Sequence, residues 1–292
     1  MPESGPMPTH VAADADAGAE AENFVIRSDA NGAEAENLVI RSDANGIATL
    51  TLNRPRRFNA MSMSMLDAIH SGLEAIAADR TMLVVVIAGA GDNFCAGHDL
   101  KEMIGNSERA FLSQLFGKCS DMMQLIGKMP QPVIARVHGI ATAAGCQLVA
   151  ACDMAVATDD ARFATSGVNY GLFCATPTVP VSRNISKKRA FEMLMTGEFI
   201  DAQTALNWGL INRIAPAAQL DEEVGKLARS MMDKPAEVIA VGKAFFHAQL
   251  EQDTVSAYRS ATAHIIDNML DDSAQEGVTA FIQKRKPSWR SG

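Results

Sequence analysis

Between residues 48 and 216, short apolar runs alternate with longer segments in which apolar residues recur at helical spacing. The run "LVVVIAGA" (83–90) is apolar at successive positions, which is typical of a strand buried on both faces. Runs of strand length lie at 48–52, 83–88, 133–137, 154–157 and 211–214, and helical segments lie at 63–78, 107–128 and 143–151. This alternation predicts an α/β core.

After Pro216 the pattern is helical almost throughout. It predicts helices at 219–232, 235–250, 253–270 and 273–283. Their apolar stripes have few partners in the same chain, so we expect this region to pack on neighbouring subunits. The sequence therefore predicts a core over residues 33–216 and a helical oligomerisation region over 217–292.

The N-terminal part contains a tandem duplication. "AEAENFVIRSDANG" (19–32) is followed at once by "AEAENLVIRSDANG" (33–46). The second copy ends in Asn45-Gly46, which favours a hairpin between 38–41 and 47–52 because both residues tolerate positive φ. Two copies are too few for a repeat fold. The duplication is therefore interpreted as a copied edge segment rather than a repeat fold. For residues 1–32 as a whole, the sequence predicts a disordered acidic tail that contains the first copy.

The composition excludes several classes of function. A chain of 292 residues, 48% of them apolar, can bury a large core, and its net charge of −8 argues against a nucleic-acid partner. No apolar run reaches the roughly 18 residues of a membrane span. Residues 1–22 carry acidic side chains but no Lys or Arg, so we expect a cytoplasmic protein that does not bind a membrane. No metal site is expected, since the cysteines lack metal-ligand spacing and are interpreted as packed thiols: Cys95, Cys119, Cys146, Cys152 and Cys174.

Two glycine-containing turns each lead from a strand into a helix. "NFCAGHDLKEM" (93–103) passes through Gly97, and Asp99 is placed to cap the following helix. "VHGIATAAGCQ" (137–147) opens a helix near Ala143. Both turns present backbone N–H groups at a helix start, where negative charge is favoured. Two such turns facing one pocket would form an oxyanion hole.

The order and spacing of these turns resemble the crotonase, or enoyl-CoA hydratase/isomerase, family. "LNRPRRFNAMS" (52–62) and "EGVTAFIQKRKPSW" (276–289) extend the resemblance from about residue 34 to the end of the chain. It implies an α/β crotonase (ClpP-like) spiral of ββα units with a C-terminal α-helical trimerisation region. It also implies an acyl-CoA thioester as ligand, with coenzyme A as part of the substrate and no separate cofactor, and a homotrimer or dimer of trimers.

The resemblance assigns the oxyanion donors to the backbone N–H groups of His98 and Ala144. These groups would hold the thioester oxygen as charge moves onto it, and one such donor contributes about 2.7 to 4 kcal/mol to catalysis. Family members usually carry glycines where this chain has Ala143 and Ala144. The resemblance also implies coenzyme A contacts at Arg56, Ala96, Asp99, Leu100, Lys101 and Lys284, although each charged side chain among them also fits an ordinary solvated surface position.

The usual acid and base of the family are missing. Hydratases of this kind use two glutamates, and the matching positions here are Gln147 and Gly167. An amide does not take a proton near pH 7, and glycine has no side chain. The resemblance therefore implies weak or absent hydratase activity, which leaves two hypotheses. The protein is an enzyme of the hydratase/isomerase class, or a related hydrolase or decarboxylase with a different base, or it is an acyl-CoA-binding or partner-binding protein without catalysis.

Other side chains near the turns have a structural interpretation beside a chemical one. The His98 imidazole titrates in the right range for a base, or it only lines the pocket. Asp99 is better explained as a helix cap, and Cys174 as a packed thiol. Asn169 and Tyr170 orient a substrate or pack behind Gly171, and His138 is interpreted as structural.

Overall fold

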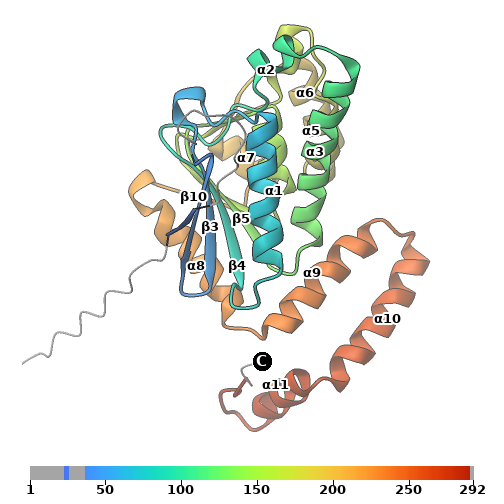
Figure 1. Cartoon of the computed structure of the whole chain (residues 1–292). Coiled ribbons are helices and arrows are strands. Elements are labelled where there is room, and N and C mark those ends of the chain that lie inside the picture. Colours follow the sequence, from blue (N-terminus) through green and yellow to red (C-terminus); the bar gives the residue numbers. More distant parts are fainter. Residues whose placement is uncertain (1–22, 26–36, 290–292) are drawn as a thin grey trace, which may run out of the picture.

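The computed structural model describes residues 23–25 and 37–289, and its main element there is a twisted sheet (Figure 1). Seven strands are hydrogen-bonded in the order β1-β2-β3-β4-β5-β7-β10 among the described residues. Their bounds are β1 Asn23–Val25, β2 Val39–Ala44, β3 Ile47–Leu52, β4 Val84–Gly89, β5 Val133–Val137, β7 Met154–Thr158 and β10 Arg213–Ala215. The strands predicted from apolar runs are thus confirmed to within about two residues.

The hairpin predicted at Asn45-Gly46 is also confirmed. Strands β2 and β3 pair antiparallel, with Val39 opposite Leu52, and both turn residues have positive φ (51° and 77°). From β3 onward the neighbouring strands β3, β4, β5, β7 and β10 run parallel. Of the range 1–32, the structure describes only Asn23–Val25, which pairs antiparallel with β2 at the sheet edge, and the rest lies outside the described residues.

Strand β4 is apolar throughout because it packs against helices on both faces of the sheet. Val85 and Ile87 join the main core, which also contains side chains of α1 (Met63–Ala77) and α3 (Arg109–Lys128). Val84 and Val86 point to the other face, where they pack with α8 (Leu220–Met232). A strand with helices on both faces has no polar side. The predicted helical segments 63–78, 107–128 and 219–232 are confirmed at these positions.

A second sheet and several short helices were not predicted. Strands β6 (Ile140–Thr142), β8 (Arg162–Ala164) and β9 (Ile200–Asp201) form a three-stranded sheet next to the second glycine turn. These strands have two or three residues, too few to show a period. Helix α4 (Ala144–Ala151) confirms the segment predicted at 143–151, and α2 (Leu100–Gly105) is the helix expected after Asp99. The helices that were not predicted are α5 Ala175–Asn184, α6 Lys187–Thr196 and α7 Ala202–Trp208, with short 3-10 turns at Pro55–Arg57, Ser166–Tyr170 and Ala217–Gln219.

The C-terminal helices form an arm that extends away from the core (Figure 1). The arm consists of α9 (Ala236–Leu250), α10 (Thr254–Leu270) and α11 (Asp272–Ile282), within one residue of the predicted bounds. Only α9 lies against the core, beside α3, whereas α10 and α11 contact the arm itself. Large apolar side chains on the arm are therefore left exposed in the single chain.

Candidate functional site

The two glycine turns lie side by side. The first follows β4 and leads into α2, and the second follows β6 and leads into α4. Backbone hydrogen bonds join them: the Cys95 N–H donates to the Ile140 carbonyl over 3.1 Å, and the Thr142 N–H donates to the Cys95 carbonyl over 3.0 Å. Strand β4 of the main sheet and strand β6 of the smaller sheet therefore end next to each other, where the two turns meet.

Gly97 is the point of closest approach between the turns. Its φ is +97°, and a Cβ placed on it would lie 2.9 Å from the Ala143 Cβ and 3.1 Å from the Ala144 backbone nitrogen. Any side chain at position 97 would therefore separate the two turns. Within the described residues, no hydrogen-bond acceptor is found for the backbone N–H of His98 or of Ala144. The structure thus brings the two predicted oxyanion donors together and leaves both free to bind an oxygen.

Ala143 has a backbone conformation that L-residues rarely adopt. It precedes α4 with φ 50° and ψ −118°, the geometry of the first central residue of a type II′ turn, which is normally glycine. This strain turns the chain sharply, so that the helix opens with the Ala144 N–H facing the first turn. Ala144 itself is helical and buried, so only the first of the two alanines occupies a position that demands glycine.

The two positions that lack glutamate lie beside these donors. Gln147 is on α4, one turn after Ala144, and is 3% exposed, and its side-chain oxygen has no hydrogen-bond partner in the described part of the chain. Gly167 follows Ser166, whose hydroxyl lies 2.9 Å from the Thr142 hydroxyl. A Cβ on Gly167 would lie 2.4 Å from the Leu172 carbonyl oxygen. Crowding, rather than a positive φ, therefore excludes a larger residue at position 167.

The His98 imidazole lies against α3. Its ring meets the Phe116 ring edge-on, with centroids 5.1 Å apart and an interplanar angle of 84°. Neither ring nitrogen has a hydrogen-bond partner among the described residues. Burial lowers the pKa of His98, and the nearby Met61 backbone opposes this only in part. The imidazole is therefore neutral at pH 7.

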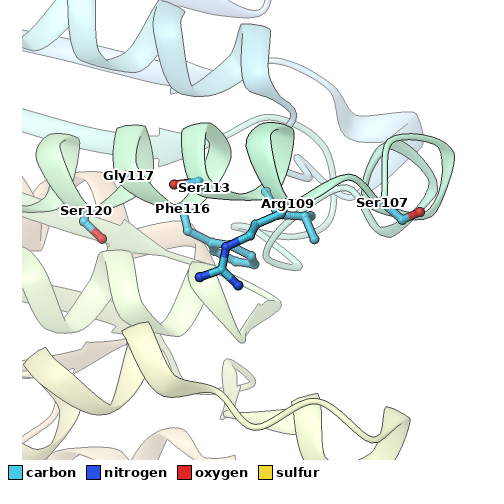
Figure 2. A pocket seen from close by; sticks show the side chains of 7 residues that line it. Ser107, Arg109, Ser113, Phe116, Gly117 and Ser120 are labelled. Atoms are coloured by element: carbon cyan, nitrogen blue, oxygen red, sulfur yellow. The ribbon is translucent and has the colours of Figure 1, made fainter.

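A cavity opens along the same face of α3 (Figure 2). It has a volume of about 640 Å³, and Figure 2 shows the Arg109 guanidinium and the Phe116 ring on one side of the helix. Its lining residues are Ser107, Arg109, Leu112, Ser113, Phe116, Gly117 and Ser120. Because the Phe116 ring lines the cavity and also contacts His98, the cavity lies next to the first glycine turn.

Asp99 is a helix cap, as predicted. Its carboxylate accepts from the N–H groups of Lys101 and Glu102 at the start of α2, and it pairs with Arg54 at 3.2 Å. Burial would raise the pKa of Asp99, but the hydrogen bonds from Glu102 and Arg54 outweigh it and hold the pKa below its usual range. A carboxylate held in this way is a poor base.

Two residues that position the first turn were missed in the sequence. Arg54 also donates to the Ala60 carbonyl over 2.9 Å, and the buried Asn59 side chain donates to the carbonyls of Ala90, Asn93 and Phe94. Both lie in "LNRPRRFNAMS", where a polar side chain between apolar neighbours at position 59 was the available signal. They attach the segment before α1 to the loop that carries Gly97.

The predicted coenzyme A contacts are only partly brought together. Ala96, Asp99, Leu100 and Lys101 surround the start of α2, and Arg56 lies exposed in the 3-10 turn Pro55–Arg57 of the neighbouring segment. Lys284 follows α11, which Figure 1 shows at the opposite end of the molecule from α2. Within one chain Lys284 does not share a site with the other residues.

The remaining candidates take structural positions. Burial raises the pKa of Cys174, so the thiolate is disfavoured, and all five cysteines are free and buried. One His138 ring nitrogen is 2.7 Å from the Gly91 carbonyl oxygen, in keeping with a structural role. The described residues contain no group of three or more His, Cys, Asp or Glu side chains placed to hold a metal. No helix in the described ranges is long and apolar enough to cross a membrane.

The site consists of two glycine turns that follow strands and present free N–H groups at the start of a helix. The sequence that forms it is similar to known proteins over most of the chain. The family model described as enoyl-CoA hydratase/isomerase matches residues 42–292. The chain belongs to this family, and the crotonase fold implied by its motifs is confirmed. Membership supports an enzymatic role.

Individual relatives narrow the comparison. The chain is 46% identical to the enoyl-CoA hydratase domain-containing protein 3, mitochondrial, of Rattus norvegicus over 83% of this chain and 81% of the relative. The crystal structure of the human enoyl-CoA hydratase domain-containing protein 3 is 44% identical in sequence and superimposes with a TM-score of 0.84. The match covers 86% of this chain and 100% of the human chain. An enoyl-CoA hydratase structure from Mycobacterium smegmatis is 51% identical with a TM-score of 0.86, covering 88% and 100%. The segments "ATAAGCQLVAACD", "FATSGVNYGLFCATP" and "FIQKRKPSW" resemble domain-containing protein 3 in particular.

Proposed function

We propose that the protein binds an acyl-CoA thioester and polarises its carbonyl between the backbone N–H groups of His98 and Ala144. The observation that carries this proposal is the pair of free donors on turns held together at Gly97. A thioester oxygen that accepts both hydrogen bonds gains charge as an enolate forms, and preorganised donors stabilise that charge most strongly. The cavity along α3 would take the acyl chain, since it adjoins the first turn.

The reaction is enolate chemistry rather than efficient hydration. Addition of water to an enoyl-CoA needs a base to activate the water and an acid to supply a proton, and Gln147 and the crowded Gly167 supply neither. Because such help contributes about 10²- to 10⁴-fold per group, hydratase activity is expected to be weak or absent. The absence of the two glutamates also leaves two alternatives. The protein is a hydrolase or decarboxylase with another base, or it is a non-catalytic acyl-CoA-binding or partner-binding protein.

The coenzyme A moiety would lie over the start of α2. Ala96, Asp99, Leu100 and Lys101 would line the nucleotide, and the guanidinium of Arg56 would contact phosphate oxygens. Arg56 has no ion-pair partner within the described residues, so its charge is available for a ligand. Lys284 would reach the same ligand only from a neighbouring copy of the chain.

Isothermal calorimetry tests the proposal by comparing hexanoyl-CoA with hexanoate. We expect the thioester to bind more tightly and Arg56→Ala to weaken its binding about fivefold, the size of a partly exposed charged contact. Arg80→Ala is the matched control, because Arg80 is exposed on a different surface. Equal affinity for hexanoyl-CoA and hexanoate, or no binding of either, would contradict the proposal.

The cytoplasmic location remains a prediction that rests on the acidic composition of residues 1–22. The related domain-containing protein 3 of rat and of human is named as a mitochondrial protein. Cell fractionation with an antibody against the chain would decide between the two compartments.

A further inference from the structure

Three buried polar atoms on residues next to the oxyanion donors have no hydrogen-bond partner among the described residues. They are the two ring nitrogens of His98 and the side-chain oxygen of Gln147. Buried polar atoms are nearly always paired, and each unpaired one costs about 1 to 3 kcal/mol. The three atoms belong to the donor residue His98 and to Gln147, one helical turn after the donor Ala144, so a substrate bound at the donors can complete these interactions.

The His98 imidazole contacts a side chain that lines the cavity. Its own backbone N–H is one of the two donors, and its ring packs edge-on against Phe116, which lines the cavity along α3. An acyl chain that passes from the donors into this cavity must run beside the ring. The first carbon after the thioester carbonyl is the part of the chain nearest to the donors.

No other side chain at the site is a ready base. Asp99 is held by two backbone N–H groups and Arg54, and the Glu102 carboxylate accepts from the Met63 N–H over 2.9 Å. Burial raises the pKa of Cys174, so its thiolate is disfavoured. Gln147 cannot accept a proton near pH 7. Among the described residues at the site, only the imidazole has a free lone pair of suitable basicity.

We infer that His98 is the catalytic base that removes a proton from the Cα of the bound acyl-CoA. This inference rests on the proposed function. An unprotonated ring nitrogen takes the proton, the C–H electron pair forms the double bond of an enolate, and the carbonyl electron pair moves onto the oxygen held by the His98 and Ala144 N–H groups. The imidazolium then returns a proton to the enolate carbon, so the reaction needs no further reactant. The unpaired Gln147 oxygen accepts a hydrogen bond from a hydroxyl of the substrate or from water.

The ionisation of His98 suits this role. Burial holds its pKa below the usual value of 6.5, so the neutral form is present at pH 7. None of the charged side chains near the ring contributes to the lowering of the His98 pKa. Those side chains are Asp99 (paired with Arg54), Lys101, Glu102, Arg109 and Lys118 (paired with Asp67). Because only the neutral ring can accept a proton, the rate should rise with pH through a pKa below 6.5 and then stay level.

Deuterium exchange into hexanoyl-CoA in D₂O measures the removal of the Cα proton directly, even if no net reaction follows. We expect the natural protein to exchange the Cα hydrogens, as seen by loss of their proton NMR signal. His98→Ala should slow the exchange at least about 100-fold, in the range of general base contributions. Added imidazole should restore part of the rate, which a merely structural histidine would not permit. His70→Ala, on the surface of α1, is the matched control and should exchange normally.

Calorimetry with hexanoyl-CoA on the same samples separates this inference from the proposed function. If hexanoyl-CoA binds but the natural protein does not exchange, or if His98→Ala exchanges at the natural rate, His98 is not the base and the binding function stands. If hexanoyl-CoA does not bind to the natural protein, the proposed function itself is wrong, and the inference about His98 falls with it. Should His98→Ala not fold, His98→Gln decides, since exchange by that variant at the natural rate would overturn the inference.

Discussion

At the scale of single residues, the strained backbone of Ala143 gives the clearest prediction. Its φ of 50° with ψ −118° suits glycine, and such strain costs of order 1 to 3 kcal/mol. Part of the gain from Ala143→Gly is offset by the greater freedom of glycine in the unfolded chain, about 0.4 to 1 kcal/mol. We expect Ala143→Gly to raise the free energy of unfolding by about 1 kcal/mol, measured by denaturant titration at fixed protein concentration.

The neighbouring alanine is the matched control for this prediction. Ala144 is the first residue of α4, helical and buried, so Ala144→Gly should lower the free energy of unfolding by about 1 kcal/mol. Opposite signs at adjacent positions would identify strain at Ala143 as the cause. A loss of stability in both variants would mean that the methyl of Ala143 stabilises the turn through packing.

The sequence predicted the donors of the candidate site but not the arrangement that holds them. Gly97 and the positions of His98 and Ala144 were available from the motifs, because the backbone there determines the chemistry. The edge-on contact between His98 and Phe116 was not, since the two residues come from different elements and no local pattern links them. Likewise the obstacle at Gly167 is the Leu172 carbonyl, which only the folded chain brings close.

At the scale of elements, long periodic segments were predictable and short ones were not. Strands β3 to β5 and helices α1, α3 and α8 are each long enough to repeat their period against a core. Strands β6, β8 and β9 have two or three residues each and are defined by pairing across the chain, as in Ala141 opposite Phe163. Helix α5 contains Pro180, which weakened its helical pattern in the sequence.

The attachment of α9 to the core depends on a buried ionic cluster. The Lys243 ammonium lies 2.7 Å from Asp153, and it donates to the carbonyls of Ile126 and Gln131 over 2.6 and 2.8 Å. Asp153 also accepts from the Val133 N–H over 2.7 Å. Burial lowers the pKa of Lys243, and Asp153 opposes this. The cluster joins α9 to α3, β5 and the segment before β7.

Removing the ammonium should loosen this attachment. Lys243→Met removes the ammonium that pairs with the Asp153 carboxylate and leaves two carbonyls without a donor, although Asp153 keeps the Val133 N–H and the contact with His247. We expect the free energy of unfolding to fall by about 3 kcal/mol in denaturant titration. Lys226→Met is the control, because Lys226 forms exposed, solvent-screened pairs with Glu222 and Glu223, so its loss should change the free energy of unfolding little. Equal losses in the two variants would show that apolar packing alone anchors α9.

At the scale of the whole molecule, one chain does not bury its own apolar surface. The arm exposes Leu250, Tyr258, Leu270, Phe281 and Ile282, each more than 60% accessible. Exposed apolar surface of this extent marks an interaction site. The arm also carries Lys284 away from the start of α2, so a ligand that contacts both must lie between two chains (Figure 1).

We therefore expect a homotrimer or a dimer of trimers in which the arm covers a neighbouring chain. Light scattering coupled to size exclusion should give the mass of three or six chains. Leu270→Asp and Phe281→Asp should each shift the population towards monomers, because a carboxylate placed in an apolar interface must be desolvated without a partner. Removal of residues 1–32 is the control and should leave the mass at three or six chains. A monomeric full chain would contradict the prediction, as would a truncated chain that no longer assembles. A shared ligand gives a second readout, since monomeric Leu270→Asp should lose the Lys284 contact and bind hexanoyl-CoA more weakly.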